Sequence, residues 1–196
     1  VASPKMSSLA GFLAAPLTVH LNTRVDKLEK TEGRWRLLDD NKVVGEGFDW
    51  VLSAIPSPQT LELMPFSDVH RVELASVRMS ACFTLMFDDV DISALPVSNA
   101  RIDHPVLGWI AVNSTKPDRN RRHACVVVHS ANAWADAHIE RPLEEIKAEM
   151  MRALRQIAPS VGDIDADRIA IHRWRYANVD RPLGEPYMLD AERGLG

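Results

Sequence analysis

The sequence lacks the common motifs that hold a phosphate group, a metal ion or a catalytic serine. Neither GxGxxG nor GxxxxGK[ST] occurs among its 196 residues, which excludes the two usual phosphate-binding loops. The seven histidines are scattered, without an HxxxH or HExxH pairing, and this argues against a metal site. No GxSxG segment marks a hydrolase nucleophile, and no residue set identifies the catalytic groups.

Cysteine, excess charge and long apolar runs are also scarce. The two cysteines, Cys82 and Cys125, lie in apolar strand-like segments without a CxxC motif, so we expect two buried, reduced thiols. The net charge of −4 provides no basic field for nucleic acid. The one basic run, residues 116–122, has no interleaved aromatics, so it predicts a solvated loop. It could still bind an anionic small molecule. No apolar window reaches about 18 residues and no signal peptide is visible, so we expect a cytoplasmic protein without a membrane partner.

The first part of the chain predicts short strands joined by turns. Ser3-Pro4 starts a short helix that Pro16 ends, and residues 17–25 alternate like a half-buried strand. Residues 25–38 predict a hairpin that turns at Glu32-Gly33, and a third strand follows at 42–47. The run at 50–52 is typical of a strand buried on both faces of a parallel sheet, and a short helix is expected at 58–64.

The second part predicts an antiparallel sheet and one long helix. Strands are expected at 77–87, 106–112, 124–130 and 168–176, with Asp-, Asn- and Pro-rich loops between the first three. Apolar residues at the spacing of one buried face predict a helix from about 142 to 158. The composition changes between Pro65 and Val69, which is the best internal boundary.

Two clusters could carry a binding site. In one, an apolar strand leads directly into Asn113, Ser114 and Lys116, which suits the wall of a small-molecule site or an ordinary exit from a strand. In the other, the period of two places Trp174 and Tyr176 on the face opposite their arginine neighbours, which suits a site or plain core packing.

Several segments, in this order, resemble bacterial renalase-type FAD-dependent oxidoreductases, which are relatives of the flavin amine oxidases. The segments are MSSLAGFLA, LTVHLNTRVDKLE, RWRLLDD, FDWVLSAIPSPQT, GWIAVNSTKP, VVHSANAWA and HRWRYA. No single motif is diagnostic, but the collinear set covers essentially the whole chain.

The resemblance implies a mixed α/β and α+β architecture. Residues 1–65 would be part of a Rossmann-like FAD domain, 66–175 a substrate domain with an antiparallel sheet and flanking helices, and 176–196 a return segment. The family's GxGxxG and Gly-Asp flavin motifs would lie before and after this sequence. The chain is therefore expected to be a central segment that binds FAD poorly by itself and leaves strand edges exposed.

The resemblance also implies a chemistry and a set of site residues. A reduced nicotinamide dinucleotide, in its dihydro isomer forms, would give a hydride to FAD, and O2 would reoxidise the flavin to yield H2O2. Two residue sets would take part. The cofactor would be contacted by Val25, Ala54, Ile55, Pro56 and Trp174, and the substrate by Trp109, Asn113, Lys116 and Tyr176.

Two other functions fit the same residues. The chain could belong to another flavin amine oxidase relative that acts on an amine or a carotenoid-like substrate. It could also be a ligand-binding or interaction domain without a cofactor, which would explain the missing phosphate loop directly.

Overall fold

In a computed structural model, two compact units make up the chain. The structure describes residues 5, 7–90, 98–119, 124–161 and 164–196. Unit 1 comprises residues 1–16 and 80–178, and unit 2 comprises residues 17–79 and 179–196. The expected functional division at residues 65 and 175 stays a prediction. Among the described residues, no helix is long and apolar enough to cross a membrane.

Unit 1 is built on a five-stranded sheet with the order β5-β6-β7-β4-β8. Its strands are β4 (Arg78–Val90), β5 (Asn99–Arg101), β6 (Leu107–Val112), β7 (Ala124–Ser130) and β8 (Ala170–Arg181). The pairs β5–β6, β6–β7 and β7–β4 are antiparallel, which confirms the expected sheet.

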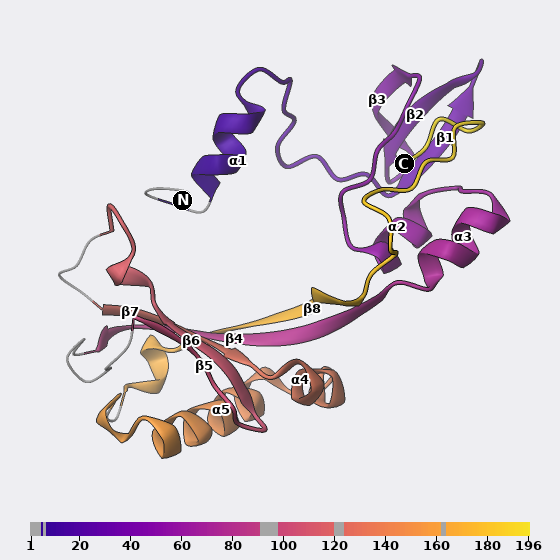
Figure 1. Cartoon of the computed structure of the whole chain (residues 1–196). Coiled ribbons are helices and arrows are strands. Elements are labelled where there is room, and N and C mark those ends of the chain that lie inside the picture. The colour runs from indigo at the N-terminus through magenta and orange to yellow at the C-terminus, as the bar shows by residue number, and fades with distance from the viewer. Residues whose placement is uncertain (1–4, 6, 91–97, 120–123, 162–163) are drawn as a thin grey trace. The chain divides into compact units, whose positions relative to one another are not determined.

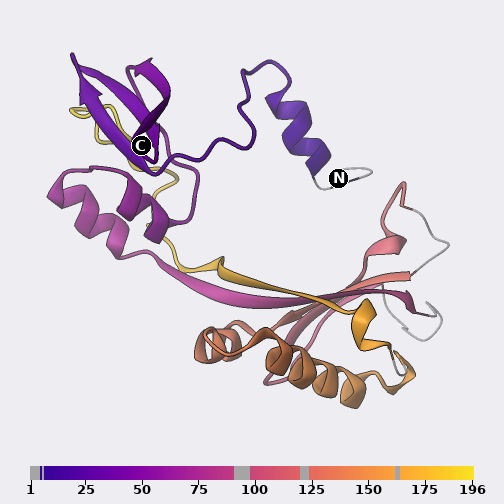
Figure 2. The same cartoon turned by 180° about the vertical axis from the view of Figure 1, so that it is seen from behind.

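Two helices, α4 (Asn132–His138) and α5 (Leu143–Ile157), cover one face of this sheet in both views (Figure 1, Figure 2). The apolar face predicted for α5 is buried at Ile146, Met150 and Leu154, which belong to the same core as Phe83 and Val128 of the sheet. Two glutamates lie in the first turn of α5 and an arginine in its last, as the helix dipole favours. The sequence did not predict α4, because seven residues are too few for a clear period.

Unit 2 contains a three-stranded antiparallel sheet of β1 (Lys27–Thr31), β2 (Arg34–Asp39) and β3 (Lys42–Phe48). Two-residue turns join the strands, and all four turn residues have positive φ, as such tight hairpins require. Helices α2 (Ser57–Leu63) and α3 (Asp68–Ala75) follow. The core of unit 2 contains Leu28, Trp35, Met64, Phe66 and Leu195, so the last residues of the chain complete it.

Three expectations from the sequence are wrong. Residues 17–25 form no strand, and their alternating leucines and valine are exposed, because alternation gives burial only where another strand pairs with the segment. In the run 50–52 only Val51 forms a bridge, parallel to Leu195, while Trp50 is 45% and Leu52 70% exposed. This run therefore has one strand partner among the described residues and no layers on both faces. Cys125 is exposed although Cys82 is buried as expected.

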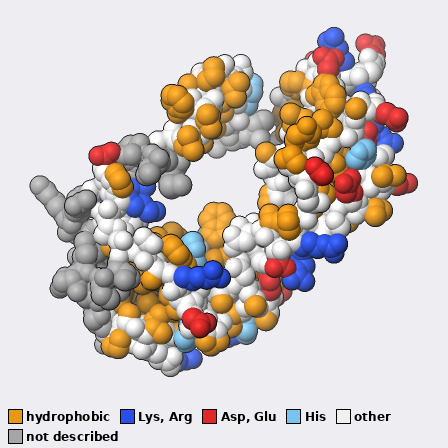
Figure 3. Space-filling view, in the orientation of Figure 1, with side chains coloured by type: hydrophobic (Ala, Val, Ile, Leu, Met, Phe, Trp, Pro, Cys, Tyr) orange, Lys and Arg blue, Asp and Glu red, His pale blue; other side chains and the backbone are white. Residues whose placement is uncertain are grey.

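Near the N-terminus the structure describes a short helix, α1 (Ser7–Ala14), in which no residue is buried. Its hydrophobic side chains are open to view in the space-filling picture (Figure 3). Ser3-Pro4, the expected start of this helix, lies outside the described residues. The same holds for residues 120–123, which include part of the expected basic loop.

Candidate functional site

The face of the unit 1 sheet that α4 and α5 leave uncovered, called here the helix-free face, carries the aromatic candidates. Along β4, Phe83, Leu85 and Phe87 are buried in the core with the helices. Because strand side chains alternate, Cys82 and Met86 point to the helix-free face. Met86 is exposed there, whereas the neighbouring Leu85 is fully buried.

A β-bulge at Gly108 turns Trp109 onto this face. Leu107 pairs with Ser130 and Trp109 with His129, so Gly108 is an extra residue in β6. Without the bulge, Leu107 and Trp109 would share a face; with it, Leu107 is fully buried and Trp109 is 37% exposed. A Cβ on residue 108 would lie 3.2 Å from the carbonyl oxygen of Ser130, so the bulge favours glycine.

Across the sheet, Trp109 stands in a row with residues from three other strands. Arg101 of β5 pairs with Trp109, Trp109 pairs with His129 of β7, and His129 pairs with Thr84 of β4. Directly paired residues place their side chains on the same face, so Arg101, Trp109 and His129 are neighbours on the helix-free face.

The imidazole of His129 is held neutral by its surroundings. Burial lowers the pKa of His129 below its ordinary value, because the charged form loses contact with water. The buried thiol of Cys82, also on this face, has a raised pKa, chiefly from burial and in spite of hydrogen bonds with Ser130. Near neutral pH both side chains are therefore uncharged.

The last strand presents Trp174 to the same face, as the period of two predicts. Arg173 lies over the ring of Phe83, with its guanidinium carbon 5.8 Å from the ring centroid, and donates a hydrogen bond to the carbonyl oxygen of Arg141. Arg175 forms an ion pair with Glu140 at 2.6 Å. Both arginines thus point to the helices, and Trp174, 52% exposed, points away from them.

Around Trp174 the face is aromatic as well. The rings of His172 and Trp174 lie 4.2 Å apart between centroids, at 60° to each other. Tyr176, two positions further, is half-buried. Strands β6 and β8 are three places apart in the sheet, so the two strands lie about 14 Å apart, and Trp109 and Trp174 share a face without being neighbours.

The other two substrate candidates follow β6. Asn113 is half-buried at the start of the short 3-10 helix η2 (Asn113–Thr115), and Lys116 is exposed at its end. Between them, the hydroxyl of Ser114 is buried and has no hydrogen-bond partner in the described part of the chain. The structure therefore places all the substrate candidates in unit 1.

Four of the cofactor candidates lie in unit 2, near the short parallel pairing of residues 51–53 with the chain end. Ser53 donates its N–H to the carbonyl oxygen of Gly196 at 2.6 Å, and its hydroxyl lies 2.7 Å from that of Thr60. The Thr60 hydroxyl donates to the carbonyl oxygen of Ile55 at 3.1 Å, which fixes the turn. Ala54 and Ile55 are exposed, while Pro56 and the more distant Val25 are half-buried.

This turn borders a cavity of about 380 Å³ within unit 2. Its walls are mainly apolar, with Ile55, Phe66 and Tyr187 among them. The hydroxyl of Ser57 also lines it and is buried without a hydrogen-bond partner among the described residues. An apolar cavity with one unsatisfied hydroxyl fits a ring and sugar of a dinucleotide, so the residues present fit part of FAD.

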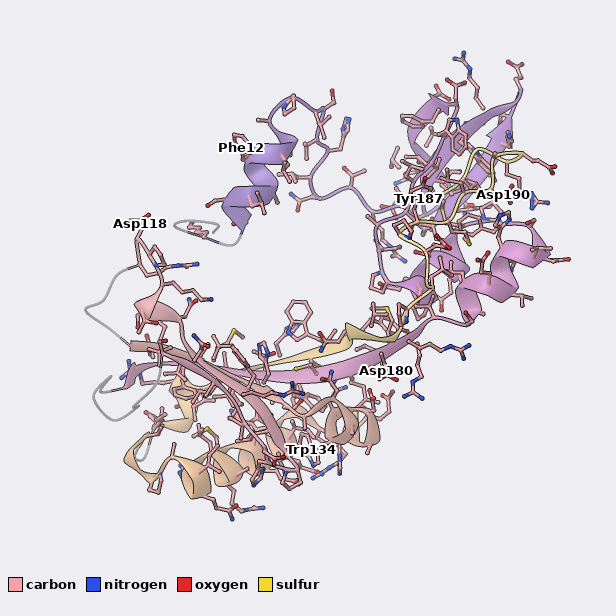
Figure 4. The ribbon with its side chains drawn as sticks, in the orientation of Figure 1. Phe12, Asp118, Trp134, Asp180, Tyr187 and Asp190 are labelled. Atoms are coloured by element: carbon pink, nitrogen blue, oxygen red, sulfur yellow. The ribbon has the colours of Figure 1, made fainter. Side chains whose placement is uncertain are left out.

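Asp190, which was not among the residues predicted from the sequence, ties the end of the chain to the start of α3 (Figure 4). Its buried carboxylate accepts the backbone N–H of Ser67 at 3.0 Å and that of Arg193 at 3.2 Å. Burial would raise the pKa of Asp190, but these hydrogen bonds and the nearby His70 and Arg193 side chains lower it below its ordinary value. No signal in the sequence distinguishes this aspartate from the exposed ones.

Ser67, His70 and Asp190 do not form a catalytic triad. The Nδ1 atom of His70 lies 2.6 Å from the Ser67 hydroxyl and 3.4 Å from the Asp190 carboxylate. A triad needs the serine and the aspartate on different ring nitrogens, so this cluster has a structural role. No group of three or more His, Cys, Asp or Glu side chains in the described ranges could hold a metal ion.

Comparison with known proteins adds a family to this geometry. The model of the family described as "Flavin containing amine oxidoreductase" matches residues 4–187. Renalase from Mus musculus is 26% identical over 179 residues, which cover 84% of this chain and 52% of renalase. The chain thus spans about half the length of this curated relative.

Two solved structures have a similar fold. A putative protoporphyrinogen oxidase from Exiguobacterium sp. 255-15 superposes with a TM-score of 0.62 at 18% identity, over 82% of this chain and 36% of that one. Putrescine oxidase bound to putrescine gives a TM-score of 0.61 at 16% identity, over 86% of this chain and 38% of that one. At these identities the likeness concerns the fold, and it confirms the expected mixed α/β class with an antiparallel sheet.

Proposed function

The chain belongs to the flavin-containing amine oxidoreductase family, and from this premise we propose that it serves an FAD-dependent oxidase that removes a hydride from a reduced nicotinamide dinucleotide. The observation that carries the proposal is the family match over residues 4–187, which extends over both units. The family confirms the expected flavin cofactor, and similarity to mouse renalase confirms the renalase-type resemblance.

In this proposal unit 2 contributes to the dinucleotide site. Bound FAD supplies the acceptor for the hydride, which is the chemistry that protein side chains lack. The turn Ala54–Pro56, exposed at Ala54 and Ile55, is the segment whose backbone a dinucleotide would approach. Ser57 offers a hydroxyl that has no other partner among the described residues. Val25 is a further proposed contact with the cofactor, and Trp174 of unit 1 is the proposed aromatic neighbour of the flavin.

The helix-free face in unit 1 is the proposed substrate wall. A flat nicotinamide ring suits Trp109 and Tyr176, since aromatic rings offer large apolar area at little entropic cost. Asn113 and Lys116 at the end of β6 would bind the polar part of the substrate. A dihydropyridine that loses a hydride becomes an aromatic pyridinium, so no side chain at the substrate wall needs to take up a proton from it. The uncharged state of His129 and Cys82 is consistent with such a role.

The test is an oxidase assay on the protein expressed from its complete natural reading frame. We expect peroxide release with dihydronicotinamide isomers, as in aged NADH, and none with amines. Peroxide release with amines instead would support the alternative hypothesis that the protein is an amine oxidase. If the protein holds no flavin and turns over none of these substrates, the result would support the hypothesis of a ligand-binding domain without a cofactor.

A further inference from the structure

A second cavity lies at the helix-free face, next to Trp109. It has a volume of about 720 Å³, within the range of small-molecule sites. Residues of β5, β6, β7 and β8 line it, and all of them belong to unit 1. Its polar and aromatic lining includes Arg101, Asp103, His104, Trp109, His129 and Asn178.

The cavity offers hydrogen-bond donors that the fold does not use. The guanidinium group of Arg101 makes no ion pair or hydrogen bond with any described residue. The Nδ1 atom of His104 accepts the N–H of Val106 at 3.1 Å, which leaves Nε2–H as a free donor of the neutral ring. Asn178 adds an exposed amide on β8.

The same cavity offers flat, uncharged walls beside these donors. Arg101 pairs with Trp109 and Trp109 pairs with His129, so the guanidinium and the two rings start from adjacent positions on three strands. Adjacent strands lie about 4.8 Å apart, so the three Cα atoms span about 10 Å. A small ring can lie on the indole while a group attached to it reaches Arg101.

We propose that this cavity binds a small planar ring that carries an oxyanion, a carboxylate or a phosphate, with the ring against Trp109 and the oxyanion on Arg101. Arginine binds both oxyanions through two parallel hydrogen bonds, so its geometry fits either one. Asp103 also lines the cavity, and its exposed carboxylate repels an anion, which limits the affinity. Removing that charge gives a second test of the role of charge. That the ligand is a substrate rests on the proposed function. Binding itself does not, because it needs no flavin.

The test is a titration of the isotope-labelled 196-residue chain, read by NMR at the indole N–H of Trp109, which Trp109→Phe assigns. The probes are benzoate and phenyl phosphate, with benzamide as the neutral analogue. We expect a saturable shift with at least one oxyanion and a much weaker response to benzamide. Whichever oxyanion binds more tightly identifies the group that the cavity prefers.

Matched variants test the role of the charge. Arg101→Met should weaken oxyanion binding by about tenfold or more, the usual effect of losing a charge-assisted pair, and Arg101→Lys by less. Asp103→Asn should tighten it. Arg152→Met makes the same change at an exposed position of α5 and should leave the affinity within about twofold. Arg101 and Asp103 are exposed, so the fold should tolerate these changes.

Three results would overturn the proposal: equal binding of benzamide and benzoate, no saturable shift with either oxyanion, or unchanged affinity in Arg101→Met. A failed oxidase assay with intact oxyanion binding would count against the proposed flavin chemistry alone.

Discussion

Trp35 donates its indole N–H to the carbonyl oxygen of Arg193 at 2.9 Å, across 158 positions of the sequence. Lys30 donates to the same carbonyl at 3.1 Å, and its ammonium group lies 5.2 Å from the centroid of the Trp35 ring. At Gly194, the next residue, a Cβ would lie only 2.4 Å from the carbonyl oxygen of Asp49. The end of the chain is therefore held against β1, β2 and the segment that follows β3.

Replacing Trp35 with phenylalanine keeps an aromatic ring in the core but removes this hydrogen bond. We expect Trp35→Phe to lower the free energy of unfolding by about 1 kcal/mol or somewhat more, since a half-buried carbonyl loses a partner. Urea denaturation measures the change. Trp50→Phe is the matched control, because Trp50 is exposed, and its effect should stay below about 0.5 kcal/mol. Equal effects of the two changes would contradict this role.

The stability of unit 2 should depend on the charge of Asp190. The pKa of this carboxylate is lower in the folded chain than in the unfolded one, where it is about 3.9. Its contribution is therefore present above about pH 4 and is lost as the pH falls through the folded pKa. Asp190→Asn should cost about 1–3 kcal/mol at pH 7 and should flatten the acid limb of the stability curve.

Asp49→Asn is the control for Asp190, since Asp49 is exposed and its ion pair with Arg34, at 3.5 Å, joins two exposed side chains. This variant should change neither the stability at pH 7 nor the shape of the acid limb. Chemical denaturation at several values between pH 3 and pH 7 gives both curves.

The bulge at Gly108 should not accept a side chain. Gly108→Ala brings a Cβ to 3.2 Å from the Ser130 carbonyl oxygen, so the backbone has to shift, at a cost of about 1–2 kcal/mol. Gly11→Ala in α1 meets nothing within 4 Å and should be neutral or slightly stabilising. Thermal unfolding compares the two, and a neutral Gly108→Ala would contradict the close approach.

His129 should take up its proton at a lower pH than a free imidazole. Its ordinary pKa is about 6.5, and burial lowers the folded value. The unfolded chain therefore binds this proton first, so the stability from His129 is complete above about pH 6.5 and declines as the pH falls below it. NMR titration of the ring protons measures the folded pKa. Trp109→Ala should expose the ring and bring the pKa back towards 6.5.

Local chemistry explains which parts of the fold the sequence could predict. The hairpin turn at Glu32-Gly33 could be read from the residues alone, because a two-residue turn needs positive φ and a glycine allows it. The buried face of α5 could be predicted from its period. The face of Trp174 followed from the alternation of side chains along one strand, because Arg173 and Arg175 on either side of it both point to the helices.

What escaped prediction depends on partners far away in the sequence. The apolar run at 50–52 looks like a buried strand, but only Val51 finds a bridge, 144 positions later, at Leu195. The alignment of Arg101, Trp109 and His129 depends on strand pairing and on one inserted glycine, neither of which the residue order reveals. The cavity beside Trp109 was therefore invisible from the sequence, although Trp109 itself was a candidate.

Unit 2 is built from two segments that lie far apart in the sequence, and this separation has a consequence for folding. Its segments 17–79 and 179–196 are separated by about half of the chain, and the buried Leu195 closes its core only with the second of them. The β4–β7 sheet and α5, in contrast, are complete by residue 157. During synthesis strands β4 to β7 can therefore pair before residues 179–196 have been made, and closing so long a loop is slow. Nascent unit 2, with Trp35 and Phe66 uncovered, is the stage at which a chaperone would be needed most.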